Sequence, residues 1–433
     1  MAANSSPFGA AEKTHATKDD VEHGSDIDSL QRGDLLSLEH TDPVLNAKMH
    51  LVNNAIDEIG MTTYQWRLFV LNGFGYAVDS LILLIQSIIA GQAALEFQPS
   101  FSRGLTIAVY VGMLVGALFW GLSADIIGRR IAFNTSLVIC SVFAIVAGSS
   151  PNWIVLGLFV CLSAFGAGGS LVLDTAVFLE FLPSKDQWLL TLMAAWWGLQ
   201  ACGVTGAWDR RGSVASAHAK KRFSLREVWV HLKGLFATKR MGLSTSLIWF
   251  SWLLIGLAYP LYNVFLPSYL ATRGASFGQL SQSITWRNYA ITNLCSIPGP
   301  ILAGLMCKSR WFWGRRGTMV IGALVTMAFF FAYTQVRNNA QNLGFNCAIS
   351  FCLNIYYGTL YAYTPEVLPS AHRGTGNGIA IGLNRVMGIL SAVIATVSNT
   401  STPVPIYTCA ALYIVMAAVA AAFPFEPMGN RSS

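Results

Sequence analysis

Residues 104–130 read GLTIAVYVGMLVGALFWGLSADIIGRR. The segment begins with an apolar stretch of about 20 residues, 104–123, which is long enough to cross a bilayer as a helix. A short charged loop that ends at Arg130 follows it. Similar stretches predict ten further spans, at residues 67–94, 131–149, 153–179, 188–207, 243–270, 288–306, 317–336, 343–364, 375–397 and 404–424. None alternates apolar and polar residues as a barrel strand does. The expected fold class is an all-α polytopic membrane protein with eleven spans.

The composition of the 433 residues fits a protein that is largely covered by lipid. Hydrophobic residues make up 54% and charged residues 11%, whereas soluble domains carry about 25% charged residues. The charge is divided unevenly along the chain. Residues 1–62 hold 11 Asp or Glu and 4 Lys or Arg, whereas residues 63–433 hold 10 Asp or Glu and 24 Lys or Arg. The net charge of +7 therefore belongs to a membrane body, and no nucleic-acid partner is expected.

Loop charges predict the orientation, since Lys and Arg gather in cytoplasmic loops. Arg129 and Arg130 lie in one short basic loop, and residues 308–316 form another. The longest loop, 208–242, holds nine basic residues: Arg210, Arg211, Lys220, Lys221, Arg222, Arg226, Lys233, Lys239 and Arg240. These loops are expected on the cytoplasmic side, and so is the acidic N-terminal tail.

The number of spans conflicts with this orientation at one place. Residues 180–187 and 208–242 are both expected inside, yet only the span 188–207 lies between them. Either this segment re-enters the membrane, or one helix is missing. Five domains are expected. Residues 1–62 form an acidic cytoplasmic tail with a short amphipathic helix at 43–60, and residues 63–207 form a bundle of five spans. Residues 208–242 form a basic loop, residues 243–425 a bundle of six spans, and residues 426–433 a C-terminal tail.

Two short motifs recur at one spacing. GRR at 128–130 returns at 314–316, and ExxPS at 180–184 returns at 366–370, both 186 residues later. The shared offset predicts an internal repeat that covers half of the membrane body. Transporters are commonly built from such repeats, with the solute site near the membrane midplane between the halves.

These motifs resemble those of the major facilitator superfamily. Residues 121–130, GLSADIIGRR, are similar to its loop G-x-x-x-D-x-x-G-R-R between spans two and three. Residues 363–374, YTPEVLPSAHRG, resemble the sugar-porter motif Y-x-x-E-x-x-P-x-x-x-R-G after span ten. Longer stretches are similar to the synaptic-vesicle-2-related branch and its fungal relatives, at residues 64–80, 165–183, 255–278 and 357–378.

The resemblance implies two pseudo-symmetric helical bundles and secondary transport by alternating access. It implies a monomer without cofactor or enzymatic activity, whose partners are a small solute, protons and the lipid bilayer. The branch normally has twelve spans, and the missing sixth would fall after Trp208, where the charge pattern leaves its gap. Cys161 replaces the arginine of the family's R-x-x-x-x-G-x-G in span four, and the drug-antiporter pattern of span five is absent from 188–207.

Two carboxylates lie within predicted spans, where charges are costly and usually functional. Asp79 lies about twelve residues, or ~18 Å, into the first span. We expect it to bind a proton and couple proton flow to solute; the alternative is a structural hydrogen bond to a neighbouring helix. Asp174 in the fourth span is expected to be either a second proton or solute site or a structural partner.

Polar residues of the C-terminal half are the expected solute ligands. Asn384 and Arg385 lie about 16 Å into span eleven, where an arginine would seek a carboxylate, an anionic solute or a structural ion pair. The other candidates carry amide or phenol groups in spans seven and ten: Asn263, Asn354, Tyr356, Tyr357 and Tyr361. This mixture suits a polar organic solute.

Charges beside the loops are expected to form a cytoplasmic gate. The resemblance implies that Asp125 caps a helix of the other half, since a carboxylate is favoured at a helix N-terminus. The remaining gate candidates are Arg129, Arg130, Glu180, Glu366 and Arg373. Topology-setting charge alone would explain the arginines, but it would not explain the glutamates.

No motif of another functional class occurs. The sequence has no GxxxxGK[ST] phosphate loop, no HExxH, no GxSxG and no metal-ligand spacing. The leading hypothesis is a proton-coupled symporter of a small polar organic solute, in the plasma or vacuolar membrane with its N-terminus in the cytoplasm. The alternative is a non-transporting, receptor-like or abridged membrane protein that lacks one helix of its N-terminal bundle.

Overall fold

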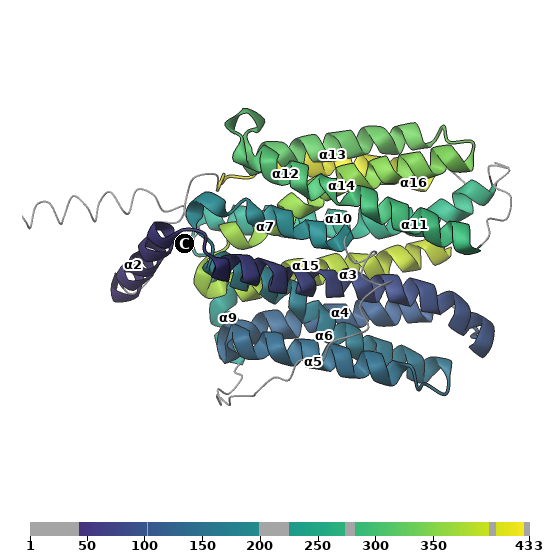
Figure 1. Ribbon diagram of the computed structural model, residues 1–433, viewed down its shortest axis with the longest axis horizontal. Coiled ribbons are helices and arrows are strands. Elements are labelled where there is room, and N and C mark those ends of the chain that lie inside the picture. Colours follow the sequence, from purple (N-terminus) through teal and green to yellow (C-terminus); the bar gives the residue numbers. More distant parts are fainter. Residues whose placement is uncertain (1–42, 102, 199–224, 273–281, 398–403, 428–433) are drawn as a thin grey trace, which may run out of the picture.

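The computed structural model describes residues 43–101, 103–198, 225–272, 282–397 and 404–427. Every regular element in these ranges is a helix, and the long helices lie side by side along one axis (Figure 1). The first bundle consists of α3 Thr63–Phe97, α4 Gly104–Ile127, α5 Arg129–Ala147 and α6 Trp153–Glu180. The second consists of α10 Lys239–Thr272, α11 Gln282–Ser296, α12 Pro298–Lys308, α13 Gly314–Tyr333, α14 Asn339–Val367, α15 Arg373–Val397 and α16 Val404–Ala421.

Shorter elements gather at one end of the molecule. The helix expected at 43–60 is found as α2 Pro43–Ile59, and it lies at the same end as α9 Leu225–Gly234 (Figure 1). Between the bundles run η1 Ser184–Asp186, α7 Leu189–Leu192 and η2 Met193–Ala195. The motif loops at 128 and 314 also lie at this end, because they follow α4 and precede α13. We call it the latch end.

The 186-residue repeat has a direct structural counterpart, which confirms two pseudo-symmetric bundles. Asn152 caps α6 by accepting from the Val155 N–H, and 186 residues later Asn338 caps α14 by accepting from the Gln341 N–H. The positive φ angles of Gly128 (100°) and Gly314 (64°) also share this offset. Such angles favour glycine, which explains why the GRR motif begins with it.

The predicted spans coincide with helices, with two local differences. The segment expected as one span at 288–306 consists of α11 and α12, which meet at Ile297–Pro298. Pro298 and Pro300 lack the N–H groups that a continuous helix would use. The segment expected at 188–207 begins as the short helices α7 and η2, and residues 199–224, including Trp208, lie outside the described part.

Membrane character is clear, although the count of eleven spans stays a prediction. Seven described segments combine a helix length of at least 18 residues with the mean hydropathy of a membrane span. Equivalent helices are covered unequally: 44% of the span in α13 is buried, but only 17% of that in α5. The reason is that α13 packs against both α14 and α16, whereas the described contacts of α5 are mainly with α6.

Candidate functional site

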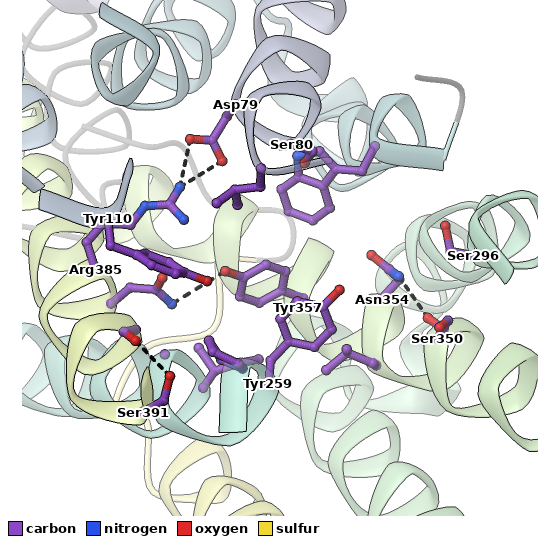
Figure 2. A pocket seen from close by; sticks show the side chains of 18 of the residues that line it. Asp79, Ser80, Tyr110, Tyr259, Ser296, Ser350, Asn354, Tyr357, Arg385 and Ser391 are labelled. Carbon is purple, nitrogen blue, oxygen red and sulfur yellow. Dashed lines mark hydrogen bonds and ion pairs between the residues drawn. The ribbon is translucent and has the colours of Figure 1, made fainter. Parts of the chain in front are cut away.

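A cavity of about 560 Å³ lies between the two bundles and is the candidate solute site (Figure 2). Its wall is built from α3 and α4 of the first bundle, from Trp197 just after η2, and from α10, α11, α14 and α15 of the second bundle. Five of the predicted solute ligands and one predicted proton site line it: Asn354, Tyr357, Tyr361, Asn384, Arg385 and Asp79. The structure therefore brings together residues that lie up to 306 positions apart in the chain.

An ion pair joins the two bundles inside this cavity. Nη2 of Arg385 in α15 donates to both carboxylate oxygens of Asp79 in α3, each at 2.7 Å (Figure 2). Each residue is only 4% exposed. All described hydrogen bonds of Arg385 run through Nη2, and its buried Nε has no described partner. The Nε–H donor of Arg385 thus has no described acceptor.

Aromatic side chains bound the cavity toward the latch end. The ring of Trp197 lies 4.9 Å from that of Tyr361 and 5.2 Å from that of Tyr357, and the two tyrosine rings are 4.9 Å apart. Asn384 Nδ2 donates to the Tyr357 hydroxyl at 3.4 Å. The ring of Trp252 packs against the ring of Tyr361, with the centroids 4.4 Å apart. The cavity therefore offers flat aromatic surfaces beside a charged pair.

Several lining residues were missed by the sequence reasoning. They are polar or aromatic side chains within otherwise apolar spans: Gln86, Thr106, Tyr110, Tyr259, Asn293 and Ser350. Gln86 Nε2 donates to the Thr106 hydroxyl at 3.0 Å, which joins α3 to α4 away from the latch end. Polarity within a span was an available signal for these residues, but it does not reveal which face of the helix meets the cavity.

Three predicted site residues do not join the described lining. Asp174 is fully buried behind α3, so close to Gly75 that a Cβ there would lie 2.0 Å from Asp174 Oδ2. Neither of its carboxylate oxygens has a described hydrogen-bond partner. Tyr356 is fully buried in the apolar core rather than in the cavity wall, because it occupies another face of α14 from Tyr357. The side chain of Asn263 lies outside the described residues.

The predicted gate carboxylate Asp125 reaches across to the other bundle. The backbone N–H of Thr375 in the first turn of α15 donates to Asp125 Oδ2 at 2.9 Å, and the Thr375 hydroxyl donates to the same oxygen at 3.1 Å. Nearby, Asn377 Nδ2 donates to the Thr175 hydroxyl of α6 at 3.0 Å. Helices α4 and α15 cross closely at Gly121 and Gly378. These contacts hold the two bundles together at the latch end.

Two ion pairs related by the repeat complete this latch. Arg129 pairs with Glu180 and donates to the Ser370 carbonyl at 3.2 Å. The equivalent Arg315, which sequence reasoning left out, pairs with the buried Glu366. Its guanidinium also donates to the first half of the chain, namely to the Gln187 carbonyl at 3.0 Å and the Thr191 hydroxyl at 2.5 Å. The 186-residue offset from Arg129 to Arg315 was the signal that could have found it.

The other two predicted gate residues differ in position. Arg130 is exposed, so it is not built into these contacts. Arg373 is 2% exposed, and its Nη2 donates to the Leu368 carbonyl at 3.5 Å. This hydrogen bond stabilises the turn between α14 and α15.

A histidine pair attaches α9 to the latch. Nδ1 of His231 in α9 lies 2.8 Å from Nδ1 of His372, the last residue of η4 Ser370–His372. Gly234 approaches the same ring so closely that a Cβ would lie 2.1 Å from Nε2. Burial, and then the neighbouring His231, lower the pKa of His372 below its ordinary value. The neutral form of His372 is therefore favoured, and in the contact one ring donates while the other accepts.

Comparison with known proteins agrees with this arrangement. Residues 55–190 match the family model described as "Sugar (and other) transporter". A siderochrome iron transporter of the major facilitator superfamily from Ceriporiopsis subvermispora is 36% identical, over 92% of this chain and 94% of its own length. The niacin transporter NiaP of Acinetobacter baylyi is 26% identical, over 80% and 90%.

The fold is that of a solved transporter, and one alignment reveals a difference in length. The proton:xylose symporter XylE, at 12% identity, superposes with a TM-score of 0.62 over 86% of this chain and 98% of its own. The Ceriporiopsis alignment extends over 493 positions, more than the 433 residues of this chain, so that relative carries internal residues that this chain lacks. With its two related bundles and its similarity over nearly the full length of a transporter, this chain belongs to the major facilitator superfamily.

Proposed function

We propose that this protein is a proton-coupled symporter of a small polar organic solute that works by alternating access. The observation that carries the proposal is the Asp79–Arg385 pair, which joins the two bundles within the wall of the central cavity. A volume of about 560 Å³ falls in the ordinary range for small-molecule sites. A charged pair shared by both bundles is sensitive to solute, to protons and to the relative position of the bundles.

We infer that the latch end faces the cytoplasm and that the cavity opens toward the other side. The basic loops at the latch end support this placement, since such loops stay inside. The contacts of Asp125 and Arg315 hold that end closed, while the lining extends past Gln86 and Thr106 toward the opposite end. The N-terminus is then cytoplasmic, in the plasma or the vacuolar membrane.

Asp79 is proposed as the main proton-binding group and Asp174 as a second one. Asp79 lies in the cavity wall, where a proton from the open side reaches it. Asp174 is fully buried and has no described hydrogen-bond partner, and such burial disfavours the charged carboxylate. Tyr76, on the same helix α3 as Asp79, stacks on Trp197 with the ring centroids 5.5 Å apart.

The names of the relatives suggest two solutes to test, niacin and an iron siderochrome. The cavity volume favours the smaller one. The test uses the purified protein in liposomes with an acidic exterior and measures uptake of radiolabelled niacin. Uptake should exceed equilibrium, collapse with a protonophore and be lost in Asp79→Asn. Glu96→Gln, on the exposed end of the same helix, is the matched control and should accumulate solute normally.

The second candidate function is an abridged or receptor-like protein without transport. The longer alignment with the Ceriporiopsis transporter and the exposure of α5 favour it. Absence of pH-driven uptake of niacin and siderochrome alike, together with retained solute binding, would support this candidate over the symporter.

A further inference from the structure

The cavity holds one negative and one positive side chain among its described lining residues. Asp79 and Arg385 are the only members of the described lining that carry full charges, and they neutralise each other. The two partners differ chemically, because a proton neutralises a carboxylate while a guanidinium keeps its charge at any physiological pH. Protonation of Asp79 therefore leaves one permanent positive charge in the site.

An unpaired arginine in such a place needs a new anion. A buried charge that loses its partner is strongly destabilising, and Arg385 is 4% exposed. The described lining offers no other carboxylate. All described hydrogen bonds of Arg385 run through Nη2, and its Nε–H has no described partner. Once protonated Asp79 releases Nη2, the Nε and Nη2 donors together present the two-donor geometry that carboxylates prefer.

From this geometry we propose that the solute is an organic monoanion whose carboxylate replaces protonated Asp79 on Arg385. The inference rests on the proposed symport function and specifies its solute class and stoichiometry. Tyr357, Tyr361 and Trp197 form the adjacent wall with ring centroids about 5 Å apart, which suits a flat aromatic body. Asn384, bonded to the Tyr357 hydroxyl, lies beside the arginine.

The exchange balances in charge. One proton adds to the Asp79 carboxylate to give the neutral acid, and Arg385 transfers its hydrogen bonds from that group to the solute carboxylate. The site holds no net charge before and after loading, so one proton accompanies one monoanion. Transport is then electroneutral, driven by the pH gradient and not by the membrane potential. A cation would instead leave the guanidinium beside a second positive charge, which is unfavourable.

The test compares benzoate with its neutral analogue benzamide and with the cation benzylamine. Binding to the purified protein is measured by calorimetry in two buffers of different ionisation enthalpy, which gives the number of protons taken up. We expect benzoate to bind with uptake of one proton and benzamide to bind roughly 10- to 100-fold more weakly. Asp79→Asn should bind benzoate without proton uptake. Asp79→Asn/Arg385→Gln, which removes both charges and leaves neither unpaired, should not bind it.

Transport separates this inference from the function on which it rests. In liposomes, a pH gradient should drive benzoate uptake, while a potassium diffusion potential of either sign at equal pH should not. Proton-driven uptake of benzamide or benzylamine in preference to benzoate would preserve the symporter and overturn the monoanion. Benzoate binding that survives in the double variant would also overturn it. If benzoate binds with one proton but is not transported, the exchange stands and the symporter does not.

Discussion

Arg385 donates from a single nitrogen to both oxygens of Asp79 at 2.7 Å, although 306 positions separate the two residues. Their helices belong to different bundles, α3 to the first and α15 to the second. The pair lies in the cavity wall and each residue is 4% exposed. It is therefore both a connection between the bundles and the charged centre of the candidate solute site.

Removing one partner of this pair should destabilise the protein more than removing both. Asp79→Ala or Arg385→Ala leaves an uncompensated buried charge and should lower the free energy of unfolding by about 3–5 kcal/mol. The double variant removes the charge as well, so its loss should be smaller than the sum of the single losses. Denaturant unfolding in detergent measures all four proteins. Additive losses would show that the two residues are not energetically coupled.

Loss of the Asp125 cap should open the latch end. Asp125→Ala removes both hydrogen bonds from Thr375, and loss of such a cap weakens a helix end by roughly 0.5–2 kcal/mol. A cysteine placed at the buried Asn377 should then react with maleimide about 5-fold faster. Arg130→Ala alters an exposed neighbour and is the control. Equal labelling rates in the two variants would show that Asp125 does not hold the latch end closed.

Acid should release α9 from the latch through the histidine pair. Because the pKa of His372 lies below its ordinary value, the contact is fully present above pH ~6.5 and is lost as the pH falls through the lowered pKa. Protonation of both rings removes the acceptor from the pair.

Limited proteolysis of residues 225–234 checks this pH dependence. The cleavage rate, normalised to a reference peptide, should increase between pH 7.5 and 5.5, whereas His372→Asn should be cleaved rapidly at both values. Lys233→Ala changes an exposed side chain of the same helix and should behave as wild type. A pH-independent rate in the wild type would contradict the prediction.

Replacement of Asp174 by its neutral isostere should be tolerated by the fold. The carboxylate is fully buried, and neither oxygen has a described hydrogen-bond partner, so its charged form gains nothing from its surroundings. Asp174→Asn should change the free energy of unfolding by less than about 1 kcal/mol. Thermal unfolding in detergent measures the change. A loss of several kcal/mol would mean that the ionised carboxylate is a structural partner.

Restoring the residues that the Ceriporiopsis relative carries should stabilise the first bundle if they supply the sixth span. Only 17% of the span in α5 is buried, against 44% in α13, which α16 covers. A chimera that replaces residues 199–224 with the corresponding longer segment should unfold roughly 5 °C higher. A Gly/Ser insertion of equal length is the control. Equal melting temperatures for the two insertions would reject the abridgement hypothesis.

The sequence by itself determined the membrane helices and the repeat. Apolar length predicted where helices run, because a helix in lipid must satisfy its own backbone and exclude charges. The common offset of the GRR and ExxPS motifs predicted the second bundle, and it reappears in the ion pairs Arg129–Glu180 and Arg315–Glu366. These features are local or depend only on spacing along the chain, so they can be detected in a single amino-acid sequence.

Only the tertiary structure decided which polar residues face one another. Asp79 and Asp174 are both carboxylates within spans. Asp79 lines the cavity with Arg385, whereas Asp174 is buried against Gly75. Tyr356 and Tyr357 are neighbours in the sequence but belong to the core and the cavity respectively. Successive residues of a helix point about 100° apart. Their surroundings depend on how each helix is rotated against distant ones, and packing between the bundles fixes that rotation.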